Sequence, residues 1–126
     1  MHGKTVLITG GTNGIGLETA RGLAQQGAQV IITGRNPEKT ASVIDDLRRS
    51  THNDAIHSLL GDLSLMADTR RLADEFTARY SRLDVLINNA GGVFQRRVVT
   101  SEGLEYTFAL NHMSYYLLSR LLLPTL

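Results

Sequence analysis

The stretch Val6–Gly16, VLITGGTNGIG, decides the fold of this chain, because an apolar run breaks abruptly into four glycines. The run predicts a buried strand, and small and apolar residues at helical spacing over 15–27 predict a helix. Gly10 allows a tight turn, Gly14 a close approach of the backbone to a diphosphate, and Gly16 packing of the helix on the sheet. The first N–H groups of the helix would face the phosphates. We therefore expect a phosphate-binding turn; a tight turn without a ligand is the alternative.

The composition indicates one globular domain. The chain has 126 residues, 42% of them hydrophobic, and a formal net charge of +1, which is enough for a core and favours neither a nucleic-acid nor a membrane partner. It has no cysteine, and its four histidines lack metal-ligand spacing, so we expect no metal site. The start, Met1–Lys4, is unlike a signal peptide, and the apolar segment Tyr115–Leu123 is too short to span a bilayer, so we expect a cytoplasmic protein.

The rest of the sequence alternates strand-like and helix-like segments. Apolar runs at 29–33, 55–60 and 85–87 predict three further strands, and the unbroken run at 29–33 is typical of a parallel strand covered on both faces. Asn36-Pro37 begins one predicted helix, Ser64 is the predicted N-cap of the next, and Thr100 or Ser101 begins a last one that runs toward Pro124. This order predicts an α/β fold with a Rossmann-type doubly wound parallel sheet, strand order 3-2-1-4, in one domain over residues 1–126.

The spacing of the glycines is more specific than their number. The general fingerprint G-x-G-x-x-G is absent, and residues 9–16 read T-G-x-x-x-G-I-G. This motif resembles the short-chain dehydrogenase/reductase family, and three later stretches match the family in the same order: Asp62-Leu63, Asn88-Asn89-Ala90-Gly91 and Asn111. The residues around Asn111 and Tyr115–Leu118 are similar to the retinol dehydrogenase and protochlorophyllide reductase branch. The resemblance identifies the chain as the N-terminal part of a longer family fold, truncated after the fourth strand and its helix.

The resemblance implies a nicotinamide cofactor and hydride transfer between it and a small-molecule carbonyl or alcohol substrate. It implies that Asp62 and Leu63 contact adenine, and that Asn111 is catalytic, bending its helix and holding a water on a proton-relay path. The residues implied at the cofactor are Thr9, Gly10, Thr12, Asn13, Gly14, Ile15, Gly16, Arg35, Asp62, Leu63, Asn88, Asn89, Ala90 and Gly91.

Several of these residues also have a purely structural interpretation. Asp62 could end its strand in an Asx turn, and Asn88 and Asn89 could be turn formers. Asn111 lies on an apolar helical stripe, where a buried asparagine needs hydrogen-bond partners whatever its function. These alternatives predict contacts within the chain, which a structure can reveal.

The end of the second strand bears on the choice of cofactor. Enzymes that use NAD usually carry Asp or Glu there, which accepts hydrogen bonds from the ribose 2′-hydroxyl. The resemblance to the family implies that Gly34 occupies that position here, and Arg35 follows it. A guanidinium binds a 2′-phosphate through two hydrogen bonds, so we expect NADP(H) in preference to NAD(H). The alternative is that Arg35 is a solvated loop charge.

The family's chemistry needs a tyrosine, a lysine four residues later, and an upstream serine. The only lysines are Lys4 and Lys39, and neither follows a tyrosine at that spacing; Tyr116 and Arg120 only imitate the pattern within the last helix. Two interpretations therefore stay open: the cofactor-binding half of a short-chain oxidoreductase, or a nucleotide-binding module without turnover. A relative of sugar-nucleotide epimerases is disfavoured by the glycine spacing and by the lack of an acid after the second strand.

The last predicted strand and helix bear on association. With no predicted strand beyond 85–87, that strand is left at the edge of the sheet, and the last helix is rich in leucine. Open strand edges and exposed apolar helix faces favour association. We expect the isolated 126-residue chain to be unstable or to form a homo-oligomer.

Overall fold

The structure, a computed structural model, describes all of residues 1–126. Its strands form one parallel sheet in the order β3-β2-β1-β4, with Val6 of β1 beside Val30 on one side and Val85 on the other. The predicted doubly wound α/β sheet is therefore confirmed. The strands are β1 (Thr5–Ile8), β2 (Gln29–Gly34), β3 (Ile56–Leu60) and β4 (Val85–Ile87).

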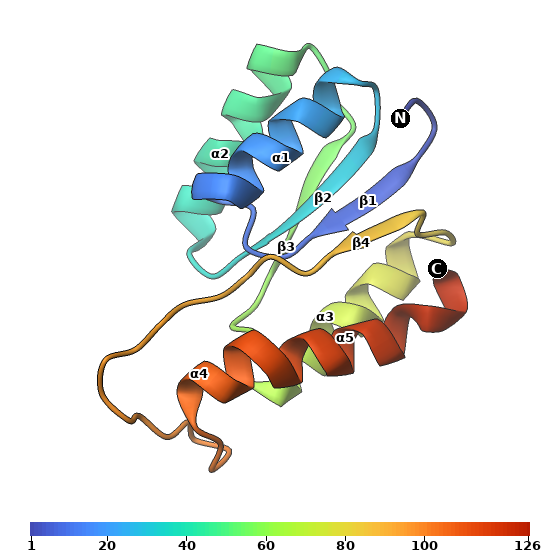
Figure 1. The fold of residues 1–126 in the computed structure, drawn as a ribbon. Coiled ribbons are helices and arrows are strands. Elements are labelled where there is room, and N and C mark those ends of the chain that lie inside the picture. Colours follow the sequence, from blue (N-terminus) through green and yellow to red (C-terminus); the bar gives the residue numbers. More distant parts are fainter.

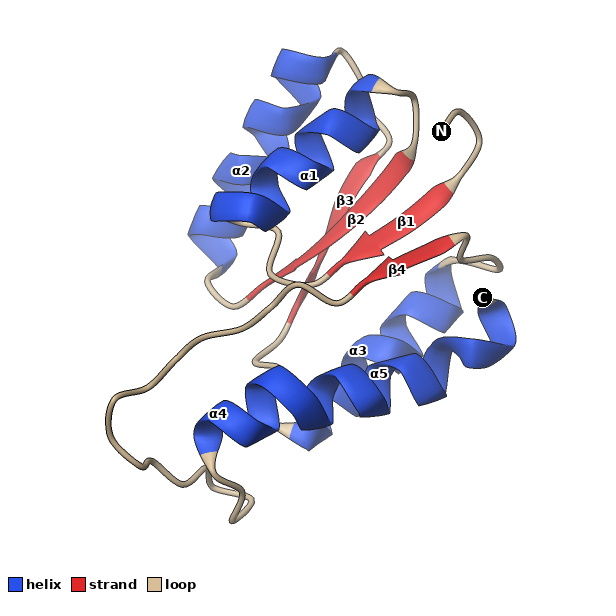
Figure 2. Cartoon of the chain, viewed as in Figure 1, coloured by secondary structure: helices blue, strands red, loops and turns tan.

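Helices cover both faces of the sheet (Figure 1, Figure 2). One face carries α1 (Gly14–Gln25) and α2 (Pro37–Thr51), and the other carries α3 (Met66–Arg79) and α5 (Ser114–Leu122). Three short segments complete the fold: α4 (Tyr106–Phe108), the π-helical segment η1 (Ala109–Met113) and the 3₁₀ turn η2 (Leu123–Thr125). None of these helices is long and apolar enough to cross a bilayer.

The central strands are buried because their side chains alternate between two apolar cores. On β1, Val6 and Ile8 belong to the core beneath α1 and α2, whereas Leu7 belongs to the core beneath α3 and α5. On β2, Ile31 and Ile32 likewise pack into opposite cores. All of these side chains are fully buried. This two-sided burial explains why both strands read as unbroken apolar runs rather than as alternating ones.

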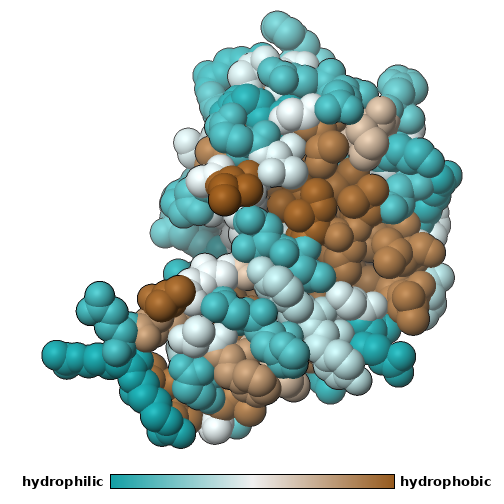
Figure 3. All heavy atoms as spheres, in the orientation of Figure 1, coloured by the Kyte–Doolittle hydropathy of each residue, from teal (hydrophilic) through white to brown (hydrophobic).

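Strand β4 forms an open edge of the sheet. Only β1 pairs with it, and its three residues are half-buried. Figure 3 shows apolar side chains gathered on this face of the molecule, and Leu123 and Leu126 near the C-terminus are both more than half exposed. Self-association of the isolated chain stays a prediction, and this edge is the surface on which it rests.

Two predicted helix starts were wrong. Helix α3 begins at Met66, with Leu65 rather than Ser64 at the N-cap position, because Ser64 turns back toward Asp62. The Ser64 N–H and hydroxyl donate to Asp62 Oδ1 at 3.0 and 2.7 Å, and the first N–H groups of the helix, those of Met66 and Ala67, donate to Glu102 instead of Ser64.

The last helix begins at Tyr106 instead of Thr100 or Ser101. Thr100 accepts the N–H groups of Glu102 and Leu104 on its hydroxyl and closes a turn. The start of α2 agrees with the prediction, since Asn36 Oδ1 accepts the Lys39 N–H at 2.9 Å with Pro37 in the first helical turn.

Candidate functional site

One cavity of about 550 Å³ lies at the carboxyl ends of the parallel strands. This edge of a doubly wound sheet is where ligands bind, because the loops that follow the strands diverge there. Its walls come from the turn after β1, the ends of β2 and β3, the loop after β4, and the first part of the last helix. The lining residues are Gly10, Thr12, Asn13, Gly14, Ile15, Thr33, Gly34, Arg35, Gly61, Asp62, Leu63, Asn89, Ala90, Gly91, Phe94, Tyr106 and Leu110.

Most of the predicted site residues belong to this lining, although they come from four separate stretches of sequence. The predicted residues outside it are Thr9, Gly16, Asn88 and Asn111. Sequence reasoning missed Thr33, Gly61, Phe94, Tyr106 and Leu110. The spacing of Tyr106 and Leu110 places them on one helical face and was an available signal, whereas nothing in the sequence distinguished Phe94.

Thr9 joins the glycine turn to the loop after β4. It is buried, and its hydroxyl oxygen accepts the N–H groups of Asn89 and Ala90 at 2.9 and 3.0 Å. In return, Asn89 Nδ2 donates to the carbonyls of Thr9 and Gly10 at 3.1 and 3.2 Å. The threonine of the glycine motif and the asparagine of the N-N-A-G motif therefore form one hydrogen-bonded unit, although about 80 residues separate them.

Close packing requires glycine at three positions of this stretch. A Cβ on Gly11 would lie 2.6 Å from Ile32 Cβ. Gly10 has φ +69°, and a Cβ there would lie 2.8 Å from Ala90 Cα. A Cβ on Gly16 would lie 2.3 Å from the Gly10 carbonyl oxygen and 2.5 Å from Asn89 Nδ2. Gly14 differs, since its φ is +55° but no atom lies within 4 Å of the position of its missing Cβ. Gly10, Gly11 and Gly16 thus serve internal packing, and Gly14 leaves space open.

The N-terminus of α1 has no internal cap. Asn13 occupies the N-cap position, and its side chain accepts no hydrogen bond from the helix. Asn13, Gly14 and Ile15 all line the cavity. The first N–H groups of the helix and the positive end of its dipole therefore lie beside the cavity, an arrangement that suits an anionic ligand.

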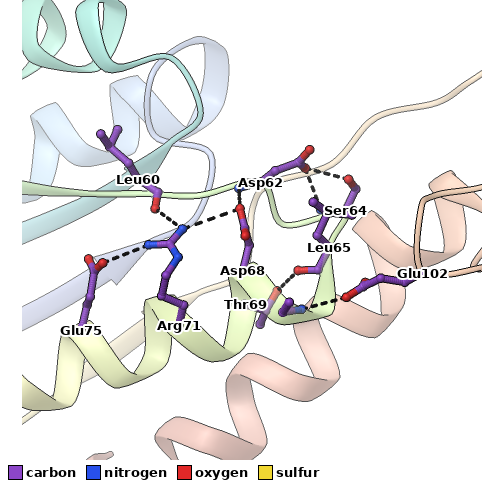
Figure 4. A network of polar contacts seen from close by, with 10 residues as sticks. Leu60, Asp62, Ser64, Leu65, Asp68, Thr69, Arg71, Glu75 and Glu102 are labelled. Atoms are coloured by element: carbon purple, nitrogen blue, oxygen red, sulfur yellow. Dashed lines mark hydrogen bonds and ion pairs between the residues drawn. The ribbon is translucent and has the colours of Figure 1, made fainter.

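Asp62, two residues after the end of β3, forms the Asx turn that the structural interpretation predicted (Figure 4). It also lines the cavity. Its own N–H donates to Asp68 Oδ2 at 2.7 Å. Nearby, Glu102 accepts the N–H groups of Met66 and Ala67 and so caps α3 from a distant loop (Figure 4). These contacts hold the end of β3 in place, and the adenine contact of Asp62 stays a hypothesis.

Asn88 and Asn111 tie the loop after β4 to the last helix. Asn88 Nδ2 donates to the Ser119 hydroxyl at 3.1 Å, while the Asn88 Oδ1 is buried without a partner.

Asn111 lies within the π-helical segment. Its Oδ1 accepts the Gly92 N–H at 3.0 Å, and its Nδ2 donates to the Gly92 carbonyl at 2.8 Å. Tyr115 donates its hydroxyl to the Ala90 carbonyl at 2.7 Å, and burial raises the pKa of this phenol, which keeps the proton in place. Asn111 thus has a structural role, and its catalytic role stays a prediction.

We expect Asn111→Asp to destabilise the protein by about 1–2 kcal/mol, because a carboxylate oxygen would face the Gly92 carbonyl in place of a donor. Denaturant unfolding measures the loss. His112→Asp is the matched control, since it adds the same charge at an exposed position of the same segment. Equal losses in the two variants would show that charge, and not the paired hydrogen bonds to Gly92, decides the outcome.

The end of β2 has no room for a side chain at position 34. A Cβ on Gly34 would lie 2.2 Å from Thr40 Oγ1 and 2.8 Å from Thr12 Cγ2, so an acid could not be placed there without rearrangement.

Arg35 follows Gly34 and borders a second cavity of about 490 Å³, which Lys39 also lines. Neither cation forms an ion pair within the chain, and the lining contains no carboxylate. Thr40 also lines this second cavity, and its buried Oγ1 has no hydrogen-bond partner. This second cavity suits an anion.

A doubly wound parallel sheet, with a glycine turn between β1 and α1 and a cavity at the carboxyl ends of its strands, defines the Rossmann-type class of α/β proteins. Within that class the chain belongs to the short-chain dehydrogenase family, whose profile, described as short chain dehydrogenase, matches residues 4–126.

The chain is similar to several known proteins. It is 41% identical over 124 residues to retinol dehydrogenase 12 of Mus musculus, covering 98% of this chain and 39% of that protein. It is 40% identical over 123 residues to polyprenol dehydrogenase of Homo sapiens, covering 98% of this chain and 37% of that protein. A solved structure, the Pseudomonas aeruginosa RhlG/NADP active-site complex, matches with a TM-score of 0.86 at 34% identity, over 100% of this chain and 49% of that one. The chain spans about two fifths of the length of these curated relatives. The predicted family resemblance is confirmed.

Proposed function

We propose that this chain is the NADP(H)-binding part of a short-chain oxidoreductase that acts on a carbonyl or alcohol carbon of a small molecule. The observation that carries the proposal is the first cavity, which the glycine turn, the uncapped start of α1, the end of β3 and Arg35 all border. The relatives named as dehydrogenases and the neighbour solved with NADP support the same conclusion.

The residues present fit a dinucleotide. The open space at Gly14 and the first N–H groups of α1 would hold the diphosphate, because both backbone approach and the helix dipole favour an anion there. Asp62 and Leu63 would lie against adenine at the end of β3. When bound, the nicotinamide supplies or accepts the hydride. The loop after β4, held by Asn111, would border the path to it.

The preference for NADP(H) over NAD(H) rests on the end of β2. The contacts of Gly34 leave no place for the acid that would pair with a ribose 2′-hydroxyl and repel a 2′-phosphate. Arg35 and Lys39 border a cavity without carboxylates, where a phosphate would meet two cations. A guanidinium can bind such a phosphate through two parallel hydrogen bonds.

Titration of the purified protein with NADPH and NADH, followed by nucleotide fluorescence, tests this proposal. We expect Arg35→Ala to weaken NADPH binding by about 10- to 100-fold, the range of a lost charge-assisted pair, and to leave NADH binding nearly unchanged. Arg49→Ala, which removes an exposed arginine at the end of α2, is the control for net charge. An equal loss of affinity for both nucleotides in the Arg35 variant would contradict the NADP(H) preference.

A nucleotide-binding module without turnover is the second candidate, because residues 1–126 contain no tyrosine followed four residues later by lysine. A carbonyl-reduction assay with NADPH tests this second candidate. Turnover would rule out the module, whereas NADPH binding without turnover is expected of both candidates.

A further inference from the structure

The guanidinium of Arg35 contacts a residue far away in the sequence. Its Nη1 donates to the hydroxyl oxygen of Tyr106 at 3.3 Å, across a separation of 71 residues. Arg35 follows β2, whereas Tyr106 begins α4, and both side chains line the first cavity. The hydrogen bond therefore links two separate walls of the nucleotide site.

Tyr106 is itself held firmly. Its backbone N–H donates to the Val98 carbonyl at 2.8 Å, and its ring packs edge-on against Phe94, with ring centroids 4.4 Å apart. The preceding residue, Glu105, caps α4 by accepting the N–H groups of Phe108 and Thr107. The Phe108 N–H is the main cause of the lowered pKa of Glu105, so this carboxylate is ionised at neutral pH. These contacts hold the Tyr106 hydroxyl in position to accept a hydrogen bond from the long, exposed side chain of Arg35.

The attachment leaves the binding edge of the arginine open. A guanidinium carries five N–H donors in a rigid plane, and the hydrogen bond to Tyr106 uses only one of the two on Nη1. The edge that presents Nε and Nη2 can still bind a phosphate through two parallel hydrogen bonds. An exposed arginine loses side-chain entropy when it binds a ligand, and a side chain that is already held in place loses less.

We propose that Tyr106 is a positioning residue that strengthens recognition of the 2′-phosphate by holding Arg35 at the border that the first and second cavities share. The inference rests on the proposed function, since it presupposes an NADP(H) site. Tyr106 lies outside every motif through which the chain resembles its family.

The test is Tyr106→Phe in the purified protein, which removes the hydroxyl and keeps the ring that packs on Phe94. We expect the Kd for NADPH to rise by about 3- to 10-fold, the equivalent of one ordinary hydrogen bond, and the Kd for NADH to change by less than about 2-fold. Adenosine 2′,5′-bisphosphate, a probe that lacks nicotinamide, should show the same loss as NADPH. Tyr116→Phe removes a hydroxyl from an exposed tyrosine on α5 and should change neither Kd.

A double-mutant cycle separates positioning from a direct contact. In the Arg35→Ala background, Tyr106→Phe should leave NADPH binding unchanged, because the residue that it positions is gone. Equal weakening of NADPH and NADH, or an effect that persists without Arg35, overturns the inference while the wild-type preference for NADPH stands. A wild-type protein that binds NADH as tightly as NADPH overturns both this inference and the NADP(H) proposal.

Discussion

Gly16→Ala is expected to reduce the free energy of unfolding by about 3 kcal/mol and to abolish tight nucleotide binding. The added Cβ would lie 2.3 Å from the Gly10 carbonyl oxygen and 2.5 Å from Asn89 Nδ2. The first of these is a backbone atom, which cannot move aside without displacing the whole turn after β1. Denaturant unfolding and NADPH titration measure the two effects.

Gly22→Ala is the matched control, because Gly22 lies in the same helix and no atom lies within 4 Å of its missing Cβ. Alanine there should stabilise the protein by up to about 1 kcal/mol, since it reduces the entropy of the unfolded chain. If Gly16→Ala were as stable as Gly22→Ala, the close packing of α1 against the turn would be disproved.

The second large effect is expected for Thr9→Val, which keeps the shape of the side chain and removes its hydroxyl. The N–H groups of Asn89 and Ala90 would then lose their acceptor. Water cannot easily replace it, because Thr9 is only 1% exposed. Leaving two such groups unpaired costs about 2–4 kcal/mol of unfolding free energy. Since Ala90 lines the cavity, we also expect weaker binding of both NADPH and NADH.

Thr9→Ser serves as the control for this variant, because it retains the hydroxyl and loses one methyl group. We expect it to stay within about 1 kcal/mol of the wild type, the size of one buried methyl group. Thermal and denaturant unfolding of the two variants in parallel compares their free energies of unfolding. Equal stability of the serine and valine variants would mean that the Thr9 hydroxyl does not hold the loop after β4.

The order of the elements could be predicted because it depends on local patterns. Each element is identified by a short stretch of sequence. Apolar runs identify β1 and β2, and the pair Asn36-Pro37 identifies the start of α2. Parallel strands joined by helices then leave few possible topologies, and the order 3-2-1-4 is one of them. The glycine and asparagine motifs likewise pointed to residues that the structure brings to one cavity.

The polar contacts around the site could not be predicted in the same way. Glu102 caps α3 from a loop more than 30 residues away, so the nearby Ser64 was wrongly expected to do so. Asn111 pairs with Gly92, and Arg35 with Tyr106, only because the loop after β4 and the last helix meet at the ends of the strands. Helical periodicity and cap preferences contain no information about such partners.

The sequence by itself determined the class of fold, the position of the glycine turn, and the lack of an acid after β2, since each of these depends on backbone geometry or residue type over a short stretch. Only the tertiary structure decided which glycines serve packing and which leaves space for a ligand, and which side chain holds Arg35 in place. The physical reason is that steric contact and hydrogen bonding act over a few ångströms in space. Residues far apart in the chain become neighbours only when the sheet and its loops have assembled.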